Sequence, residues 1–179
     1  MPKFLNPFEK PAYFKQALFL YAKYSKFLDD DFARDGKSIY EYFENLVKAT
    51  YPFCFVIVEG DEVAGFVYLG HIIGDSERLY SAELTTCFDK KYWGIYTKLC
   101  ADIFINFCFE KLGFQKIKAL VYPENFRVKT LLRYSGFKKE ALLKGETLRN
   151  NKLQDIEVYS CRPTPPLPLW ERAEFLNEP

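Results

Sequence analysis

The sequence predicts a mixed α/β (α+β) domain, in which a central sheet is covered by helices on both faces. The first observation is the near-continuous apolarity of residues 53–58 and 63–69, which are rich in β-branched and aromatic side chains. Such runs are typical of strands that are buried on both faces. The second is the order of the patterns, because two helices precede the strands and further helices are interspersed among them.

Composition sets the outer limits of the domain and its partners. With 179 residues and a hydrophobic fraction of 49%, the chain can bury a real core, and we assign residues 1–162 to one domain. The formal net charge of +1 favours neither nucleic acid nor an anionic membrane as a partner. Five cysteines without paired spacing predict reduced thiols in a cytoplasmic protein and no metal site. No N-terminal segment combines a basic start with a long apolar run, and no run approaches membrane-spanning length, so neither a signal peptide nor a membrane span is expected.

Two helices are expected before the first strands. Apolar residues recur at helical spacing over 12–28, and Pro11 suits the first turn, where its missing N–H is not needed. Ser38 and Glu41 form a capping box for a second helix over 39–49.

The remaining elements follow from alternation, turns and helix-ending residues. Gly60 and Asp61 fit a tight turn between the first two strands, and Asn150 and Asn151 fit the last turn because asparagine tolerates positive φ. Gly113 is typical of a helix C-terminus. The other predicted elements are strands over 79–88, 116–121, 138–149 and 153–161, and helices over 96–112 and 125–134.

Residues 163–179 form a Pro-rich C-terminal tail. Proline cannot continue a helix and does not pair within a central strand, so an extended segment is predicted. A loosely packed terminus is one interpretation of this composition, and a ligand for an SH3-like groove is the other.

The strongest functional signal is a basic loop between the strand 79–88 and the long helix that follows. The loop contains Lys90, Lys91 and Gly94, and Lys98 follows within the helix. A helix N-terminus presents unpaired N–H groups and the positive end of a dipole, which suit a phosphate. A plain strand-to-helix turn with a solvated basic face is the alternative.

Two runs, 82–99 and 121–137, together resemble the GNAT superfamily of N-acetyltransferases, which binds acetyl-CoA. The subgroup most resembled acetylates protein N-termini and small amines. The resemblance implies a mixed, mostly antiparallel sheet that splits between the strands at 79–88 and 116–121. It also implies a first strand within residues 1–10, for which Phe4 and Leu5 are the best candidates.

The resemblance assigns a cofactor role to the end of the strand, to the loop and to an asparagine further on. Strand backbone would pair with the pantetheine amides, loop N–H groups would approach the pyrophosphate, and two aromatic rings would line the cofactor edge. The asparagine also suits a helix N-cap. These residues are Cys87, Phe88, Lys91, Tyr92, Trp93, Gly94, Ile95, Tyr96 and Asn125.

Glu83 is the catalytic residue that the resemblance implies. It would take a proton from the acceptor amine, directly or through a water, so that the amine attacks the thioester without a covalent enzyme intermediate. A strand carboxylate in solvent or in a salt bridge is the alternative. Three positions depart from the family pattern: Tyr96 replaces a small residue, Val128 replaces a serine and Leu132 replaces the tyrosine that acts as general acid. They favour a second hypothesis, a non-catalytic member that serves as a binding or assembly module.

The acceptor is expected to be an amine on a small molecule or a peptide. Asp29, Asp30, Asp31 and Asp35 can attract a cationic amine, although an acidic run is more often a solvated loop. His71, the only histidine, is interpreted as a packing or substrate-side residue, because no second metal ligand accompanies it. The sequence leaves a homodimer open, and also a small binding module whose tail recruits a partner.

Overall fold

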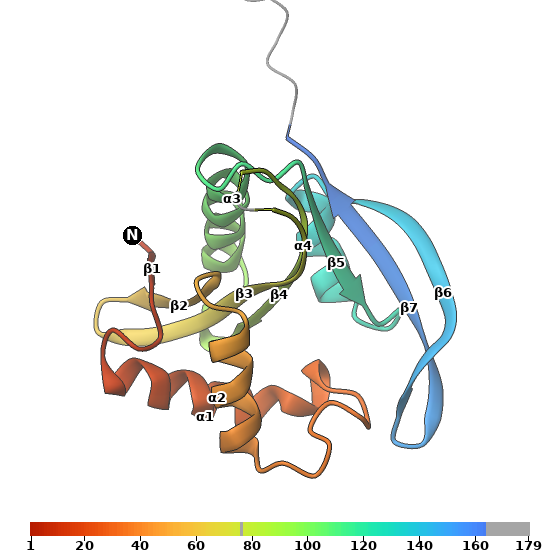
Figure 1. Ribbon diagram of the computed structural model, residues 1–179, viewed down its shortest axis with the longest axis horizontal. Coiled ribbons are helices and arrows are strands. Elements are labelled where there is room, and N and C mark those ends of the chain that lie inside the picture. The colour runs from red at the N-terminus through yellow and green to blue at the C-terminus, as the bar shows by residue number, and fades with distance from the viewer. Residues whose placement is uncertain (76, 164–179) are drawn as a thin grey trace, which may run out of the picture.

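The computed structural model describes residues 1–75 and 77–163, which form seven strands, four α-helices and one short 3-10 helix (Figure 1). In chain order the elements are β1 (Lys3–Leu5), α1 (Pro11–Leu28), α2 (Ile39–Ala49), β2 (Cys54–Glu59), β3 (Glu62–Gly74), β4 (Leu79–Phe88), η1 (Lys90–Tyr92), α3 (Ile95–Glu110), β5 (Lys116–Val121), α4 (Phe126–Tyr134), β6 (Lys138–Arg149) and β7 (Lys152–Cys161).

The strands form one mixed sheet in the order β1-β2-β3-β4-β5-β7-β6. Within the described residues every neighbouring pair is antiparallel except β4 and β5, which are parallel. The predicted fold class, a mixed and mostly antiparallel sheet, is confirmed. The short strand β1 contains Phe4 and Leu5, the residues proposed for it.

The parallel pair splits after three rungs. Ser81, Ala82 and Glu83 of β4 lie opposite Lys116, Ile117 and Lys118 of β5, and the pairing ends there. β4 continues to Phe88 and keeps its pairing with β3 along this stretch. The predicted split between the two strands is therefore confirmed, and it opens towards the loop that leads into α3.

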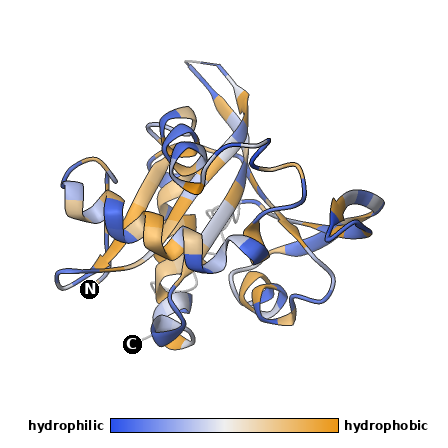
Figure 2. Ribbon diagram, turned by 90° about the horizontal axis from the view of Figure 1, so that it is seen from below, coloured by the Kyte–Doolittle hydropathy of each residue, from blue (hydrophilic) through white to orange (hydrophobic). Residues whose placement is uncertain are grey.

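Helices cover both faces of the sheet, as predicted, and divide the core into two clusters (Figure 1). One cluster lies between the sheet and the helices α3 and α4, and its largest fully buried members include Phe114, Ile117 and Tyr159. The other lies beneath α1 and α2 and includes Tyr21, Phe43 and Phe66. Figure 2 shows the hydrophobic strands in the interior and hydrophilic loops at the periphery.

Local signals account for most boundaries. The Ser38–Glu41 capping box forms in both directions, and α2 begins at Ile39 as expected. Asn150 and Asn151 adopt φ values of 52° and 57° in the last turn. β3 is longer than predicted and reaches Gly74, because it continues as a hairpin with β4 beyond the covered part of the sheet.

The helix α3 has two adjacent apolar stripes, and only one of them is fully buried. Leu99 is 45% exposed, whereas Cys100, Phe104 and Cys108 are buried. Both stripes are apolar, so periodicity indicated a broadly buried helix without showing which side meets the sheet.

Most of the predicted tail lies outside the described residues, which reach Pro163. No helix in the described part of the chain is long and apolar enough to cross a bilayer.

Candidate active site

Glu83 and Lys118 face each other at the last rung before β4 and β5 separate. Lys118 Nζ lies 3.2 Å from Glu83 Oε1, and the two side chains are only 21% and 22% exposed. Strand alternation places Glu83 on the same face as Cys87, which packs in the cluster beneath α1 and α2. The predicted base is thus part of an ion pair at the apex of the split.

His71 lies beside this pair but is not packed in the core. Its Nε2 atom is 3.9 Å from Glu83 Oε2, and its side chain is 82% exposed. His71 has a φ of 44° and lies where the register between β3 and β4 shifts. At such a bulge a side chain no longer follows the regular alternation between the two faces of the sheet. The packing interpretation is therefore wrong, and a substrate-side contact stays a prediction.

Beyond Glu83, β4 borders the split without a partner from β5. The hydroxyl of Thr86 is buried there and has no hydrogen-bond partner among the described residues. Burial raises the pKa of the Cys87 thiol to about 12. This cysteine is thus a small, protonated core residue, and any contact with a cofactor would use its backbone.

The loop after β4 leaves the N-terminus of α3 open. Asp89 caps the 3-10 turn by accepting a hydrogen bond of 3.2 Å from Lys91 N, whereas no side chain caps α3. Gly94 precedes the helix with a φ of 107°, and a Cβ added there would meet nothing within 4 Å. Such an open, uncapped helix start fits an approaching phosphate group.

Two charged residues of this loop, Lys91 and Asp89, already have partners. Lys91 bonds to Glu62 at the start of β3, and Tyr92 donates a hydrogen bond of 3.0 Å to the same carboxylate. Lys23 of α1 forms an ion pair of 2.8 Å with Asp89. The charge of Lys91 is therefore directed towards β3 in this structure.

Tyr96 points its hydroxyl into the interior of the protein. Its ring lies 5.2 Å from that of Tyr92, and its hydroxyl is buried without a hydrogen-bond partner among the described residues. Burial, together with the neighbouring Cys100 and Glu59, raises the pKa of this phenol. Because the hydroxyl is buried, and the space around Gly94 is empty, the ring does not cover Gly94.

The helix α4 begins with a side-chain cap and offers no acid at the expected position. Asn125 Oδ1 accepts a hydrogen bond of 3.3 Å from Val128 N, so the predicted N-cap is confirmed. Leu132 is buried in the core, and Tyr134 is 56% exposed beneath Lys98, whose Nζ lies 4.5 Å above the ring.

The acidic loop after α1 is bound to the tip of the β6–β7 hairpin, although the sequence favoured a solvated loop. Asp31 accepts hydrogen bonds of 2.8 Å from both Asn150 N and Asn151 N. Asp30 accepts one of 2.6 Å from Thr147. Asp29 accepts one of 2.6 Å from Tyr21 within the domain.

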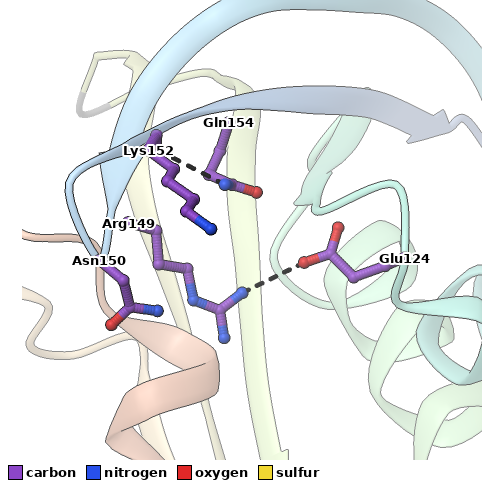
Figure 3. A pocket seen from close by; sticks show the side chains of 5 residues that line it. All are labelled: Glu124, Arg149, Asn150, Lys152 and Gln154. Atoms are coloured by element: carbon purple, nitrogen blue, oxygen red, sulfur yellow. Dashed lines mark hydrogen bonds and ion pairs between the residues drawn. The ribbon is translucent and has the colours of Figure 1, made fainter.

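Arg149 and Glu124 were missed by the sequence interpretation. Arg149 Nη1 lies 3.4 Å from Glu124 Oε1, and its guanidinium lies 4.6 Å above the Tyr122 ring. Figure 3 shows Arg149 and Glu124 among the side chains that line a pocket. Its volume is about 260 Å³, and a second pocket of about 300 Å³ adjoins the acidic loop. Arg149 also donates a hydrogen bond to the carbonyl oxygen of Lys26 in α1. No local signal in the sequence indicates these contacts, because Glu124 lies 25 positions and Lys26 lies 123 positions from Arg149 in the chain.

Comparison with solved structures defines the class of protein. The chain superposes on spermidine N-acetyltransferase from Vibrio cholerae in complex with CoA and spermine with a TM-score of 0.70, at 20% identity, covering 90% of this chain and 94% of that one. It superposes on ribosomal-protein-S5-alanine acetyltransferase from Vibrio fischeri with a TM-score of 0.70, at 17% identity, covering 93% and 94%. A GNAT-family acetyltransferase from Bacillus anthracis gives 0.65 at 17% identity over 83% and 87%. At these identities the likeness establishes an acetyltransferase fold.

The family follows from the sequence itself. The family model described as acetyltransferase (GNAT) domain matches residues 10–138, and the chain belongs to this family. Acetyltransferases of this family use acetyl-CoA as co-substrate. No curated protein matches the sequence. Among the described residues, no cluster of three potential metal ligands is found.

Proposed function

We propose that the protein transfers an acetyl group from acetyl-CoA to a primary amine by direct attack of the amine on the thioester. One observation carries this proposal. The Glu83 carboxylate lies where the two central strands begin to separate, and the same split opens towards an uncapped, glycine-led helix start. A base and a phosphate site therefore lie at the two ends of one stretch of β4.

The cofactor would lie along the unpaired part of β4. Backbone groups near Cys87 and Phe88 have no partner on β5 and suit the pantetheine amides, whereas the N–H groups from Gly94 to Tyr96 suit the pyrophosphate. Asn125 uses only its carbonyl oxygen for the helix cap, so its amide group is available for a further hydrogen bond.

The acceptor would approach from the face that carries α1 and α2. Glu83 is directed to this face. The acidic loop after α1 and the tip of the β6–β7 hairpin, which are joined by hydrogen bonds, border it. The neighbouring solved structures include an enzyme named for spermidine and one named for the alanine of a ribosomal protein, both amine acceptors. An amine on a small molecule or on a peptide fits this arrangement.

The proposed chemistry assigns the proton transfer to Glu83. An amine must be neutral to attack, and the carboxylate, held by Lys118 and lying near the exposed His71, can accept the proton that the amine loses. A covalent acyl-enzyme through Cys87 is not favoured, because its thiol has a pKa of about 12 and stays protonated at neutral pH. No side chain of α4 is assigned to the departing thiolate.

A non-catalytic binding role is the second candidate. The buried Leu132, the pairing of Lys91 with Glu62 and the hydrogen bond of 3.1 Å from Trp93 Nε1 to Phe88 O favour it, because they reduce what the site can offer to a substrate.

Calorimetric titration with acetyl-CoA, followed by an assay of acetyl transfer to spermine and to an alanine-initiated peptide, separates the two candidates. Binding together with acetylated product is expected. Binding without product for a broad panel of amines would favour the non-catalytic role, and the absence of binding would exclude the proposed site.

A further inference from the structure

An arginine and a tryptophan from opposite sides of the split are in contact. Trp93 belongs to the loop that continues β4, whereas Arg127 lies in the first turn of α4, which follows β5. The guanidinium carbon of Arg127 lies 4.6 Å from the centre of the Trp93 ring. Because β4 and β5 are not paired beyond Glu83 and Lys118, this contact links the segments that follow the two strands, as does the contact of Lys98 with the Tyr134 ring.

The indole of Trp93 is held over the end of β4. Its Nε1 atom donates a hydrogen bond of 3.1 Å to the carbonyl oxygen of Phe88, the last residue of the strand. The ring of Tyr24 lies 6.4 Å away on the α1 side, and Trp93 remains 42% exposed. The indole therefore lies at the open end of the split, one residue before Gly94.

Arg127 has no acidic partner to hold it there. The side chain is exposed, and no ion pair with a carboxylate is found for it within residues 1–75 and 77–163. A guanidinium on an exposed ring is held weakly, whereas a phosphate accepts two parallel hydrogen bonds from the same group. A phosphate at the uncapped start of α3 would therefore compete effectively with the indole.

The geometry points to Arg127 as a phosphate-binding residue of the acetyl-CoA site, which leaves the Trp93 ring when the cofactor binds. This inference rests on the proposed function, because it concerns the same site. The phosphate is either the pyrophosphate or the 3′-phosphate of the cofactor, since both present the same chemistry to a guanidinium.

Tryptophan emission gives a readout that is independent of catalysis. The chain has two tryptophans, and Trp170→Phe leaves Trp93 as the only tryptophan whose emission is measured. In this background, CoA is expected to change the emission of Trp93 with the same Kd that calorimetry measures. In the Arg127→Ala variant, the emission of the free protein is expected to be shifted already towards that of the CoA-saturated protein.

Affinity gives the second readout. Arg127→Ala is expected to weaken CoA binding about tenfold, the size typical of a lost charge-assisted hydrogen bond. Arg127→Lys should keep part of the affinity. Arg133→Ala is the matched control, because Arg133 is an exposed arginine on the same helix and has no role in the site. Circular dichroism checks that each variant is folded.

Dephospho-CoA, which lacks the 3′-phosphate, separates the two sources of phosphate. If Arg127 binds the 3′-phosphate, Arg127→Ala weakens CoA but not dephospho-CoA; if it binds the pyrophosphate, both weaken equally. Undiminished CoA affinity in Arg127→Ala, or constant Trp93 emission while CoA binds, would overturn this inference alone. Failure of the wild-type protein to bind CoA would overturn the proposed function and this inference together.

Discussion

At the scale of single residues, Glu83 has the most direct consequence for function. Its carboxylate is held by Lys118 at 3.2 Å and lies at the apex of the split. Glu83→Gln keeps the size and the hydrogen-bonding reach but removes the base. General base catalysis contributes on the order of 10²–10⁴-fold, so we expect kcat to fall by about that factor while CoA affinity is nearly unchanged.

The pH profile of the same variant completes this test. A wild-type rate that follows only the ionisation of the amine, with Glu83→Gln equally active, would assign the acceleration to positioning of the two substrates. Glu77→Gln is a suitable control, because Glu77 is an exposed carboxylate in the turn before β4.

Tyr96 is a residue-scale departure from the family pattern that the structure explains in part. Its hydroxyl is buried without a hydrogen bond of good geometry, and the Glu59 carboxylate, which contributes to the raised pKa of the phenol, likewise has a buried oxygen without a partner. Tyr96→Phe keeps the ring and removes only the hydroxyl, so it should change the free energy of unfolding by no more than about 1 kcal/mol and leave CoA affinity unchanged. Denaturant unfolding and calorimetry measure the two effects.

Tyr96→Ala restores the small residue of the family and tests the site itself. It should bind CoA as tightly as wild type or more tightly, although the loss of a half-buried ring lowers stability. A large loss of affinity in a folded Tyr96→Ala protein would identify the ring as a ligand for the cofactor.

At the scale of elements, the hairpin β6–β7 and the loop after α1 form one connected unit (Figure 1). The Asp31 carboxylate accepts backbone hydrogen bonds from Asn150 and Asn151, and Thr147 bonds to Asp30. Two chain segments that border the proposed acceptor side are therefore held together by a few polar contacts.

Asp31→Asn weakens this connection without changing the size of the side chain. We expect faster amide hydrogen exchange at Asn150 and Asn151 and a Tm lower by about 2–4 °C, the shift expected for one net hydrogen bond in a domain of this size. Asp35→Asn removes the same charge from the same loop, where the residue has a φ of 44° that asparagine tolerates, and should change neither quantity. Equal effects of the two variants would point to net charge instead.

At the scale of the whole molecule, stability is expected to depend on acid-sensitive ion pairs. Glu157 is almost buried, and its partners are Lys139 at 2.9 Å, Lys129 at 3.6 Å and the Tyr159 hydroxyl at 2.9 Å. The bond from Lys139, with further help from Tyr159 and Lys129, lowers the pKa of this carboxyl below its usual range.

The sign of the pH effect follows from that direction. A carboxyl with a lower pKa in the folded state stabilises the fold above its unfolded pKa, which is about 4.3, and loses this contribution as the pH falls through the folded value. Tm should therefore fall below about pH 4.5, and Glu157→Gln should flatten this fall while lowering Tm at pH 7. Thermal scans between pH 3 and pH 7 measure both. An unchanged acid slope in Glu157→Gln would mean that other carboxyls, such as Glu140, dominate.

The sequence alone determined the local structure to a large degree, because the signals for it are local. The Ser38–Glu41 box, the Asn150–Asn151 turn and the alternating pattern of β5 each depend on neighbouring residues, and the structure has these elements where they were expected. The order of the elements, together with the runs around Gly94 and Asn125, was also sufficient to indicate the family.

Only the tertiary structure decided which polar groups meet. That Asp31 binds the hairpin tip, that Lys91 turns to Glu62 and that Arg127 lies on Trp93 depends on segments brought together by the sheet order. The same holds for α3, where two apolar stripes competed and packing selected the one with Cys100 and Phe104. The sequence offers many residues that could pair with a given charged or aromatic side chain on the surface of an element. Only the three-dimensional arrangement of neighbouring elements decides which of them is close enough to do so.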